Sequence, residues 1–445
     1  MSPAYSAIVA LVAAAVLILL LVQRLSGHPR AVAYTGLLFA IVAGFFGWQA
    51  PQPIALAIVA LSLTCGIGLL LIPVLEPAVP MHVAEAAAVL LLGTAGAIGL
   101  ANASDLLQAV VGLETLALGA VTLVALSAAE RSLEAAFKYV VLGAISLAGL
   151  LYGLGLVYLG TGSLAFPTAA QIGANPLTLA GVVLVGLGFA FELALVPLHW
   201  AALDAYTAAA PGLAGFVMSA SKVAAAFALG RLVIAAGVQT SQLLVWGGSL
   251  TILLGTFGAL WQAGDFRRVL AYSAITHAGF IGLALGSGPA GPTTAGFYAA
   301  TYASMAMLVF AGLSATPTVP DLEGLAGTSA LPDLRALDRL RALAVGLGLL
   351  SLSGIPPTPG FWAKLAVLVV AWQSAGWLPT LIAIFGGVFS VLYYLRPLPD
   401  IFAALRGEGA VTRPVLVPGV VVALAVVVVL SIVPGVAWYL VGGAS

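Results

Sequence analysis

The feature that most constrains this sequence is its succession of apolar stretches, each about as long as a lipid bilayer is thick. A transmembrane helix needs about 20 mostly apolar residues. A soluble domain carries about 25% charged residues, whereas only 7% of these 445 residues are charged. The sequence therefore predicts an all-α, polytopic membrane protein. It excludes a soluble enzyme, a nucleic-acid-binding protein, a coiled coil and a disordered chain.

Fourteen stretches are long enough to be transmembrane helices, and two of them are interrupted. The interruptions fall at Pro197 and His199 and at Ser353 to Pro357. Proline lacks a backbone donor and clashes with the preceding turn, so each of these stretches should form two half-helices. In a bilayer such a break survives only where it lines a cavity or is buried in protein. The predicted spans are 5–22, 31–48, 53–75, 83–101, 104–127, 132–160, 178–209, 211–236, 242–262, 268–287, 294–315, 341–372, 377–395 and 415–440.

Arginines indicate how the spans are oriented. Eleven arginines fall in odd-numbered connections, and only Arg231 falls in an even one. Because cytoplasmic connections are enriched in Lys and Arg, we expect the odd connections in the cytoplasm and both termini on the opposite side. The eleven are Arg24, Arg30, Arg131, Arg267, Arg268, Arg335, Arg339, Arg341, Arg396, Arg406 and Arg413.

Two groups of five spans share the same layout. Spans four to eight and nine to thirteen each have an interrupted helix as their fourth member, and an odd number of spans inverts the second group. Interrupted helices in inverted repeats are typical of a transport site near the middle of the membrane. The predicted organisation is an N-terminal three-helix segment (1–80), a first repeat (83–236), a second repeat (242–395), and a C-terminal loop with the last helix (396–445).

All three lysines of the chain lie within apolar spans, whereas the connections use arginine; they are Lys138, Lys222 and Lys364. A desolvated ammonium can release its proton, but a guanidinium stays charged. We therefore interpret the lysines as proton-carrying groups. For Lys138, near the cytoplasmic end of its helix, a side chain that extends to the membrane surface is the alternative.

Two glutamates and one histidine extend this pattern. Glu114 lies ten residues into the fifth span, and Glu192 lies five residues before Pro197. An intramembrane carboxylate costs at least about 2.5–3.5 kcal/mol unless it is paired or hydrated, so a structural ion pair is the alternative to a functional role. His277, in the middle of the tenth span, is either suited to proton relay or a hydrogen-bonded core residue.

The sequence contains no phosphate-binding loop, dinucleotide fingerprint or metal-ligand cluster. The single Cys65 leaves no disulfide framework. Glycine spacings such as Gly153 and Gly155 lie within apolar runs and indicate close helix packing. Asp204 and Tyr206, after the first interruption, are as compatible with a structural as with a functional role. We therefore expect no cofactor and no redox chemistry in this chain, which should move an ion.

The stretches that carry these residues resemble the antiporter-like membrane subunits of respiratory complex I (NADH-quinone oxidoreductase), above all the subunit N family. The resemblance extends from about residue 83 to 395 and follows the order of the two repeats. Its stretches are residues 114–164, FELALVPLHW and the residues after it (191–232), FRRVLAYSAITHAGFIGLALG (266–286) and SLSGIPPTPGFWAKL (351–365).

The resemblance implies a fourteen-helix subunit whose two inverted units form one proton path. Glu114 would match the family's fifth-helix glutamate, Lys222 its central eighth-helix lysine, and Lys364 its lysine on the broken twelfth helix. Lys138 and His277 would match a sixth-helix lysine and a tenth-helix histidine. The resemblance also implies a multi-pass protein of the inner (plasma) membrane that assembles with other antiporter-like and small membrane subunits. Quinone, NADH, FMN and iron–sulfur clusters would then be bound by partner subunits.

The sequence departs from the family at Glu192, where the family has a lysine in a stretch resembling FKLALVPFH. Two ionised carboxylates that face one another repel unless a cation lies between them. We expect Lys138 to supply that cation, in a Glu114–Lys138–Glu192 cluster. The family motif PDVYEGAP is also altered, to LDAYTAAAP at residues 203–211.

The expected mechanism is a proton path from the cytoplasm through Lys222 and His277 to Lys364, controlled by the two glutamates and driven by redox chemistry in partner subunits. One alternative is a subunit of a multisubunit sodium/proton antiporter, whose SGIPP stretch is similar; the LLYG and TGSL elements favour complex I. Subunit M is disfavoured because a carboxylate is expected where Lys364 stands. A scaffold without transport is the other alternative, and it predicts that removal of the buried charges is harmless or stabilising.

Overall fold

The structure is a computed structural model that describes residues 2–21, 24, 28–75, 83–126, 130–237, 241–262, 264–314, 334–408 and 417–432. These residues form helices joined mostly by short connections. The helices are α1 (Pro3–Leu20), α3 (Pro29–Trp48), α4 (Ile54–Leu75), α5 (Val83–Ala101), α6 (Leu106–Ala125), α7 (Glu130–Thr161), α8 (Ala169–Ala174), α9 (Pro176–Leu193), α10 (Trp200–Ala208), α11 (Pro211–Ala235), α12 (Gln242–Trp261), α13 (Phe266–Leu285), α14 (Gly291–Leu313), α15 (Arg339–Ser353), α16 (Pro359–Ser374), α17 (Trp377–Leu395), α18 (Leu398–Arg406) and α19 (Pro418–Ile432), with one 3-10 turn at Leu334–Ala336.

Twelve of the described helices are long and apolar enough to cross a membrane. The interrupted pair α15–α16 and the shorter apolar helix α19 occupy the two remaining predicted spans. The prediction of an all-α polytopic membrane protein is therefore confirmed. The last predicted span, 415–440, is described over residues 417–432, and Arg413 lies outside the described residues. Two short helices, α8 and α18, were not predicted as separate elements.

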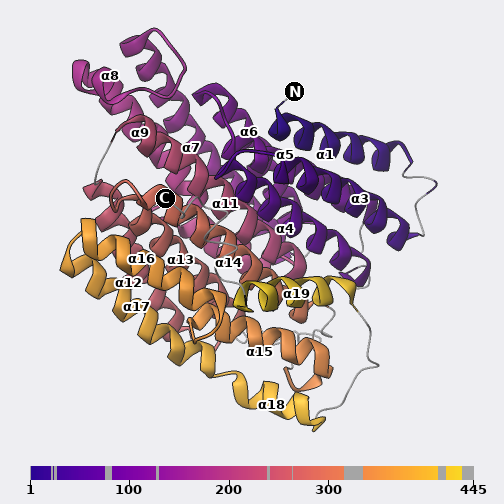
Figure 1. Cartoon of the computed structure of the whole chain (residues 1–445). Coiled ribbons are helices and arrows are strands. Elements are labelled where there is room, and N and C mark those ends of the chain that lie inside the picture. Colours follow the sequence, from indigo (N-terminus) through magenta and orange to yellow (C-terminus); the bar gives the residue numbers. More distant parts are fainter. Residues whose placement is uncertain are drawn as a thin grey trace.

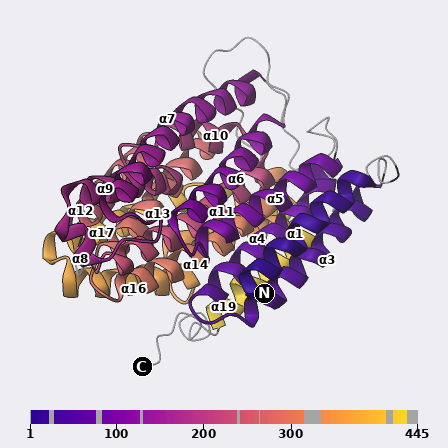
Figure 2. The same ribbon diagram turned by 90° about the horizontal axis from the view of Figure 1, so that it is seen from above.

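The centre of the bundle consists of α11, α13 and α14, in which nearly every residue is buried. Figures 1 and 2 show α11 and α14 between α1 and α3 on one side and α12 and α17 on the other. By contrast, most of the surface of α7 faces outward. Lys222 on α11 and His277 on α13 therefore lie on two of the three helices whose side chains have least access to lipid or water.

Small residues bring several helix pairs into backbone contact. A Cβ atom at Gly112 on α6 would lie 2.4 Å from the backbone nitrogen of Leu100 on α5, so only glycine allows this crossing. Gly153 on α7 packs equally closely on Gly181 of α9, as predicted, whereas Gly155 faces open space. The packing role predicted for this glycine pair is therefore confirmed for one member and wrong for the other.

Both interrupted spans end their first half-helix with the same backbone turn. The capping residues, Ala194 after α9 and Gly354 after α15, have left-handed φ angles of 65° and 84°. The next residue donates to the carbonyl five positions earlier in each, at 2.9 Å for Leu195 and 3.2 Å for Ile355. Such caps satisfy carbonyls that the helix end leaves free. The predicted half-helices are confirmed at both places, while the limits of the two repeats stay a prediction.

The connections at the C-terminal side of the bundle hold several ion pairs. Arg335 donates to Asp400 at 2.7 Å, which attaches α18 to the connection before α15. On the exposed end of α18, the Arg406 guanidinium lowers the pKa of the neighbouring Glu408 carboxyl. Arg341, expected in a connection, instead lies within α15 and is only 2% exposed.

Candidate functional site

Lys222 is buried at the middle of α11, with no measurable exposure. Its ammonium donates to the Tyr206 hydroxyl on α10 at 3.3 Å. It also lies 4.9 Å from the centroid of the Tyr206 ring and 5.5 Å from that of Tyr302. Aromatic faces and one hydroxyl can stabilise a positive charge, but they bind it less firmly than a directly paired carboxylate would. This environment can therefore hold the lysine with or without its proton.

Glu192 is the penultimate residue of α9 and is 2% exposed. Neither of its carboxylate oxygens has a hydrogen-bond partner among the described residues. Glu114 on α6 and Lys222 on α11 both lie within electrostatic range of it. Glu192 is therefore within electrostatic range of both a like charge and an opposite one.

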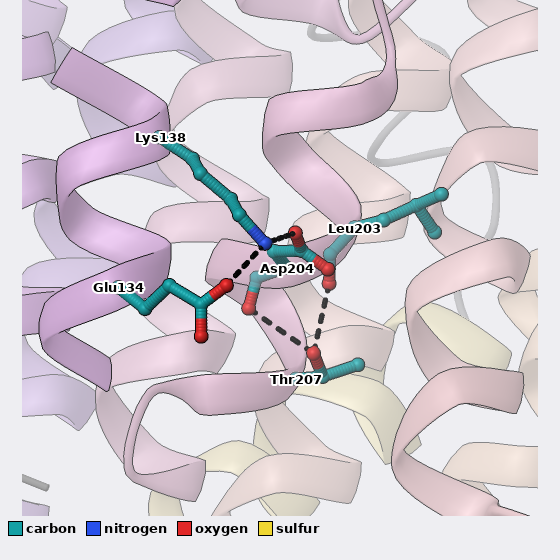
Figure 3. Close-up of polar contacts among 5 residues, drawn as sticks. All are labelled: Glu134, Lys138, Leu203, Asp204 and Thr207. Carbon is teal, nitrogen blue, oxygen red and sulfur yellow. Dashed lines mark hydrogen bonds and ion pairs between the residues drawn. The ribbon is translucent and has the colours of Figure 1, made fainter. Parts of the chain in front are cut away.

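Lys138 does not lie between these glutamates. Its Nζ atom contacts Glu134 Oε1 at 2.7 Å and Asp204 Oδ2 at 3.2 Å, and its side chain is 47% exposed (Figure 3). Glu134 is one turn earlier on α7, and Asp204 is on the half-helix α10. The expected Glu114–Lys138–Glu192 cluster is thus wrong. A partly exposed ammonium with two carboxylates within reach avoids the cost of moving its charge into the bundle.

The Lys138 ion pairs should add little to stability because both partners are exposed. We expect Asp204→Asn to leave the thermal unfolding temperature of the assembled protein nearly unchanged. Asp338→Asn is the matched control, since Asp338 pairs at 2.7 Å with the buried Arg341. That change should cost about 3–5 kcal/mol, the range for breaking a buried pair. Equal losses in the two variants would contradict this distinction.

His277 is held by both ring nitrogens in the middle of α13. Nδ1 lies 2.8 Å from the Tyr298 hydroxyl, and Nε2 lies 3.2 Å from the Tyr394 hydroxyl. The Tyr302 ring also lies beside the imidazole, with 4.8 Å between the ring centroids. His277 is therefore a buried imidazole with a hydroxyl at each side, an arrangement that suits both a hydrogen-bonded core residue and a proton relay.

Lys364 joins the second interruption to the bundle. Its ammonium donates to the Ser353 carbonyl at 2.8 Å and to the Ser390 hydroxyl at 3.1 Å. Ser353 is the last residue of α15, so its carbonyl is one of those that the helix break leaves without an intrahelical donor. The Phe280 ring lies 5.8 Å away. The broken helix therefore supplies the polar contact for this lysine.

Electrostatic interactions link five of the six predicted site residues into one series, of which Glu114 is only partly buried. The charges of Lys222 and Lys364 both act on His277, and Lys222 and Glu192 act on one another. With Glu114, the series passes from α6 through α9, α11 and α13 to α16. Lys138 lies outside it. That these groups carry protons stays a prediction.

The tyrosines around the series were not predicted from the sequence. Tyr298, Tyr302 and Tyr394 are all at most 2% exposed. One available signal was the spacing of Tyr298 and Tyr302, which are four residues apart and so lie on the same face of a helix. The contact of Tyr394 with His277 depends on how α17 packs on α13, which no local pattern indicates.

Asp204 also has a place that the sequence left open. It lies ten residues after the capping Ala194, and Lys364 lies ten residues after the capping Gly354. The two half-helices α10 and α16 thus carry a charged residue at the same distance from the same backbone turn. In the first it is an aspartate paired with Lys138, and in the second a lysine.

The rest of the described structure offers no comparable polar site. Within the described ranges, no three His, Cys, Asp or Glu side chains are placed to hold a metal ion. A cavity of about 260 Å³ lies between α7, α9 and the first interruption. It is lined by apolar side chains such as Leu142, Phe191 and Pro197, with Ser146 as a polar exception. This cavity is separate from the charged series.

Comparison with known proteins identifies the family. Residues 103–390 match the family model described as NADH:quinone oxidoreductase/Mrp antiporter, TM. The chain is 34% identical over 416 residues to the NADH-quinone oxidoreductase subunit N of Cereibacter sphaeroides, covering 90% of each. It is also 34% identical over 377 residues to the subunit N of Deinococcus radiodurans, covering 80% of this chain and 74% of that one. The predicted resemblance to the subunit N family is confirmed.

Solved structures with the same fold support this result. A chain of respiratory complex I from Thermus thermophilus with bound aureothin superposes with a TM-score of 0.78 and 30% identity, covering 96% of this chain and 97% of that one. A chain of the Mrp complex from Dietzia sp. reaches a TM-score of 0.79 at 20% identity, covers 99% of this chain and 96% of that one, and shows the fold alone. The chain therefore belongs to the NADH:quinone oxidoreductase/Mrp antiporter family of transmembrane subunits.

Proposed function

We propose that this chain is the N-type, proton-translocating subunit of an NADH-quinone oxidoreductase. It carries protons across the membrane and performs no redox chemistry itself. Two observations support the proposal: the relatives named subunit N match most of the chain, and the Thermus thermophilus complex I chain is more similar in sequence than the Mrp chain. The sodium/proton antiporter reading is correspondingly weaker.

The observation that carries the proposal is the buried series of ionisable groups. Lys222, His277 and Lys364 are at most 8% exposed; the first two lie in the central helices of the bundle, and Lys364 lies on α16. Ionisable groups at membrane depth are costly, and they mark ion paths or proton relays. A scaffold without transport would be more stable with apolar residues at these positions.

In this mechanism, a proton from the cytoplasm reaches Lys222, passes His277 and leaves from Lys364 on the other side. A negative charge near Lys222 stabilises its ammonium form, and loss of that charge favours release of the proton. Glu114 and Glu192 are placed to control this step. Lys138, with Glu134 and Asp204, lies at the rim of the bundle beside the half-helix α10, where it can attract and pass on protons before the buried series begins.

The energy comes from partner subunits. Quinone, NADH, FMN and iron–sulfur clusters belong to those subunits, and this chain lies in the inner (plasma) membrane among other antiporter-like and small membrane subunits. Both of its termini face the non-cytoplasmic side. The exposed apolar face of α7, which includes Phe137, Ile145 and Tyr152, suits contact with lipid or with a neighbouring subunit.

The proposal is tested with the intact complex in proteoliposomes, where NADH oxidation and proton uptake are measured together. Lys364→Met should lower the number of protons taken up per electron, because the exit group is lost. Lys364→Arg keeps a positive charge but cannot release a proton, so it should lower that ratio as well. An unchanged ratio in both variants would support the scaffold, and proton uptake that requires sodium would support the antiporter reading.

A further inference from the structure

Four residues from three helices form a hydrogen-bonded chain around the imidazole. Tyr298 on α14 contacts Nδ1 of His277, and Tyr394 on α17 contacts Nε2. The Tyr394 hydroxyl also hydrogen-bonds to the hydroxyl of Ser273, which lies one turn before His277 on α13. All four side chains are at most 2% exposed.

The protons of this chain can be arranged in two ways. A neutral imidazole has one N–H group and one nitrogen that accepts. In the first arrangement, Tyr298 donates to Nδ1, Nε2 donates to Tyr394, and Tyr394 donates to Ser273. In the second, Ser273 donates to Tyr394, Tyr394 donates to Nε2, and Nδ1 donates to Tyr298. Each arrangement satisfies all three contacts.

We propose that Tyr298 and Tyr394 are the positioning residues of His277, which hold its ring by both nitrogens in either tautomer. This inference rests on the proposed function. An imidazole that takes a proton on one nitrogen and releases one from the other ends in the opposite tautomer. Because each hydroxyl can rotate between donating and accepting, the same two tyrosines hold the ring before and after that transfer.

Other charged or titratable groups also face the imidazole. The charges of Lys222 on α11 and Lys364 on α16 act on it, and Tyr302 on α14 contacts it through its ring. Both ring nitrogens are already occupied by Tyr298 and Tyr394. Tyr393, the neighbour of Tyr394, is a buried tyrosine that makes no hydrogen bond to His277, and it is a suitable control.

The test measures coupled proton uptake by the intact complex in proteoliposomes. Tyr298→Phe and Tyr394→Phe should each lower its rate roughly two- to tenfold, the factor that corresponds to one net hydrogen bond of about 0.5–1.5 kcal/mol. The control variant Tyr393→Phe should stay close to the unaltered complex. All three changes remove only a hydroxyl from a buried ring, so a general loss of packing would affect them alike.

A double-mutant comparison separates a positioning role from a structural one. If the tyrosines act through His277, then adding Tyr394→Phe to His277→Gln should lower proton uptake no further. Normal uptake in both Tyr298→Phe and Tyr394→Phe, or a further loss in the double variant, would overturn the inference. If His277→Gln alone transfers protons normally, the proposed path through His277 is itself wrong. If only His277→Gln loses transfer, the path stands and the positioning role is refuted.

Discussion

Replacing Lys222 with methionine should abolish proton transfer through this chain and leave the complex assembled. Proton transfer by a positioned side chain contributes about 10²–10⁴-fold to a rate. Lys222 is the only member of the proposed path that lies on α11, and it is buried there. Methionine has a similar length and makes favourable contacts with aromatic rings, two of which already surround the ammonium. Thermal unfolding should therefore occur at the same or a higher temperature.

The measurement is proton uptake per NADH oxidised in proteoliposomes, together with the amount of intact complex recovered. Lys138→Met is the matched control, because it removes the same ammonium from a side chain that is 47% exposed and lies outside the buried series. It should reduce proton uptake less than Lys222→Met does. Normal proton transfer in Lys222→Met would refute the assignment of this lysine, and loss of assembly would show a structural role instead.

Replacing Glu192 with glutamine should have the second-largest effect. The change removes the charge and keeps the shape of a carboxyl group that has no hydrogen-bond partner among the described residues. Because Glu192 lies within electrostatic range of both Glu114 and Lys222, its charge influences whether Lys222 holds a proton. We expect coupled proton uptake to fall by more than about tenfold, since an interaction of about 1.4 kcal/mol already changes an equilibrium by that factor.

The control for this prediction is Glu134→Gln, the same chemical change at an exposed carboxylate that contacts Lys138. It should lower proton uptake less than Glu192→Gln does. Protein stability should not fall in Glu192→Gln, because a neutral amide is less costly to bury than an unpaired carboxylate. Full proton pumping in Glu192→Gln would remove this residue from the mechanism, whatever its burial.

Glu192 also makes this chain different from the pattern that its family resemblance implies, in which a lysine stands at this position. We expected the Lys138 ammonium to lie beside Glu192 and offset its charge, but that lysine is paired with Glu134 and Asp204 instead. Glu192 instead has the ammonium of Lys222 as the opposite charge that acts on it. In this chain a carboxyl and a lysine are therefore neighbours in the series, within electrostatic range of one another.

Much of the architecture was predictable because its causes are local. The lengths of the apolar stretches indicated the transmembrane helices, and Pro197 and the Gly354–Pro357 segment indicated the two interruptions. The burial of Glu192, Lys222, His277 and Lys364 followed from counting residues within each span, whereas Glu114 is only partly buried. Burial of a charge in an apolar helix is visible in the sequence because few charged residues occur there.

The contacts of these residues depend on which helix faces meet, and that information is not local. Lys138 pairs with Glu134 and Asp204 because α10 packs against α7 near the residue. The Lys138 side chain is partly exposed there, and an ion pair is less costly at such a place than in the core. Tyr394 reaches His277 across a contact between α17 and α13 that joins residues more than 100 positions apart. Hydrophobicity and proline act along the chain and can be read from it, whereas hydrogen bonds between distant helices exist only once the bundle has packed.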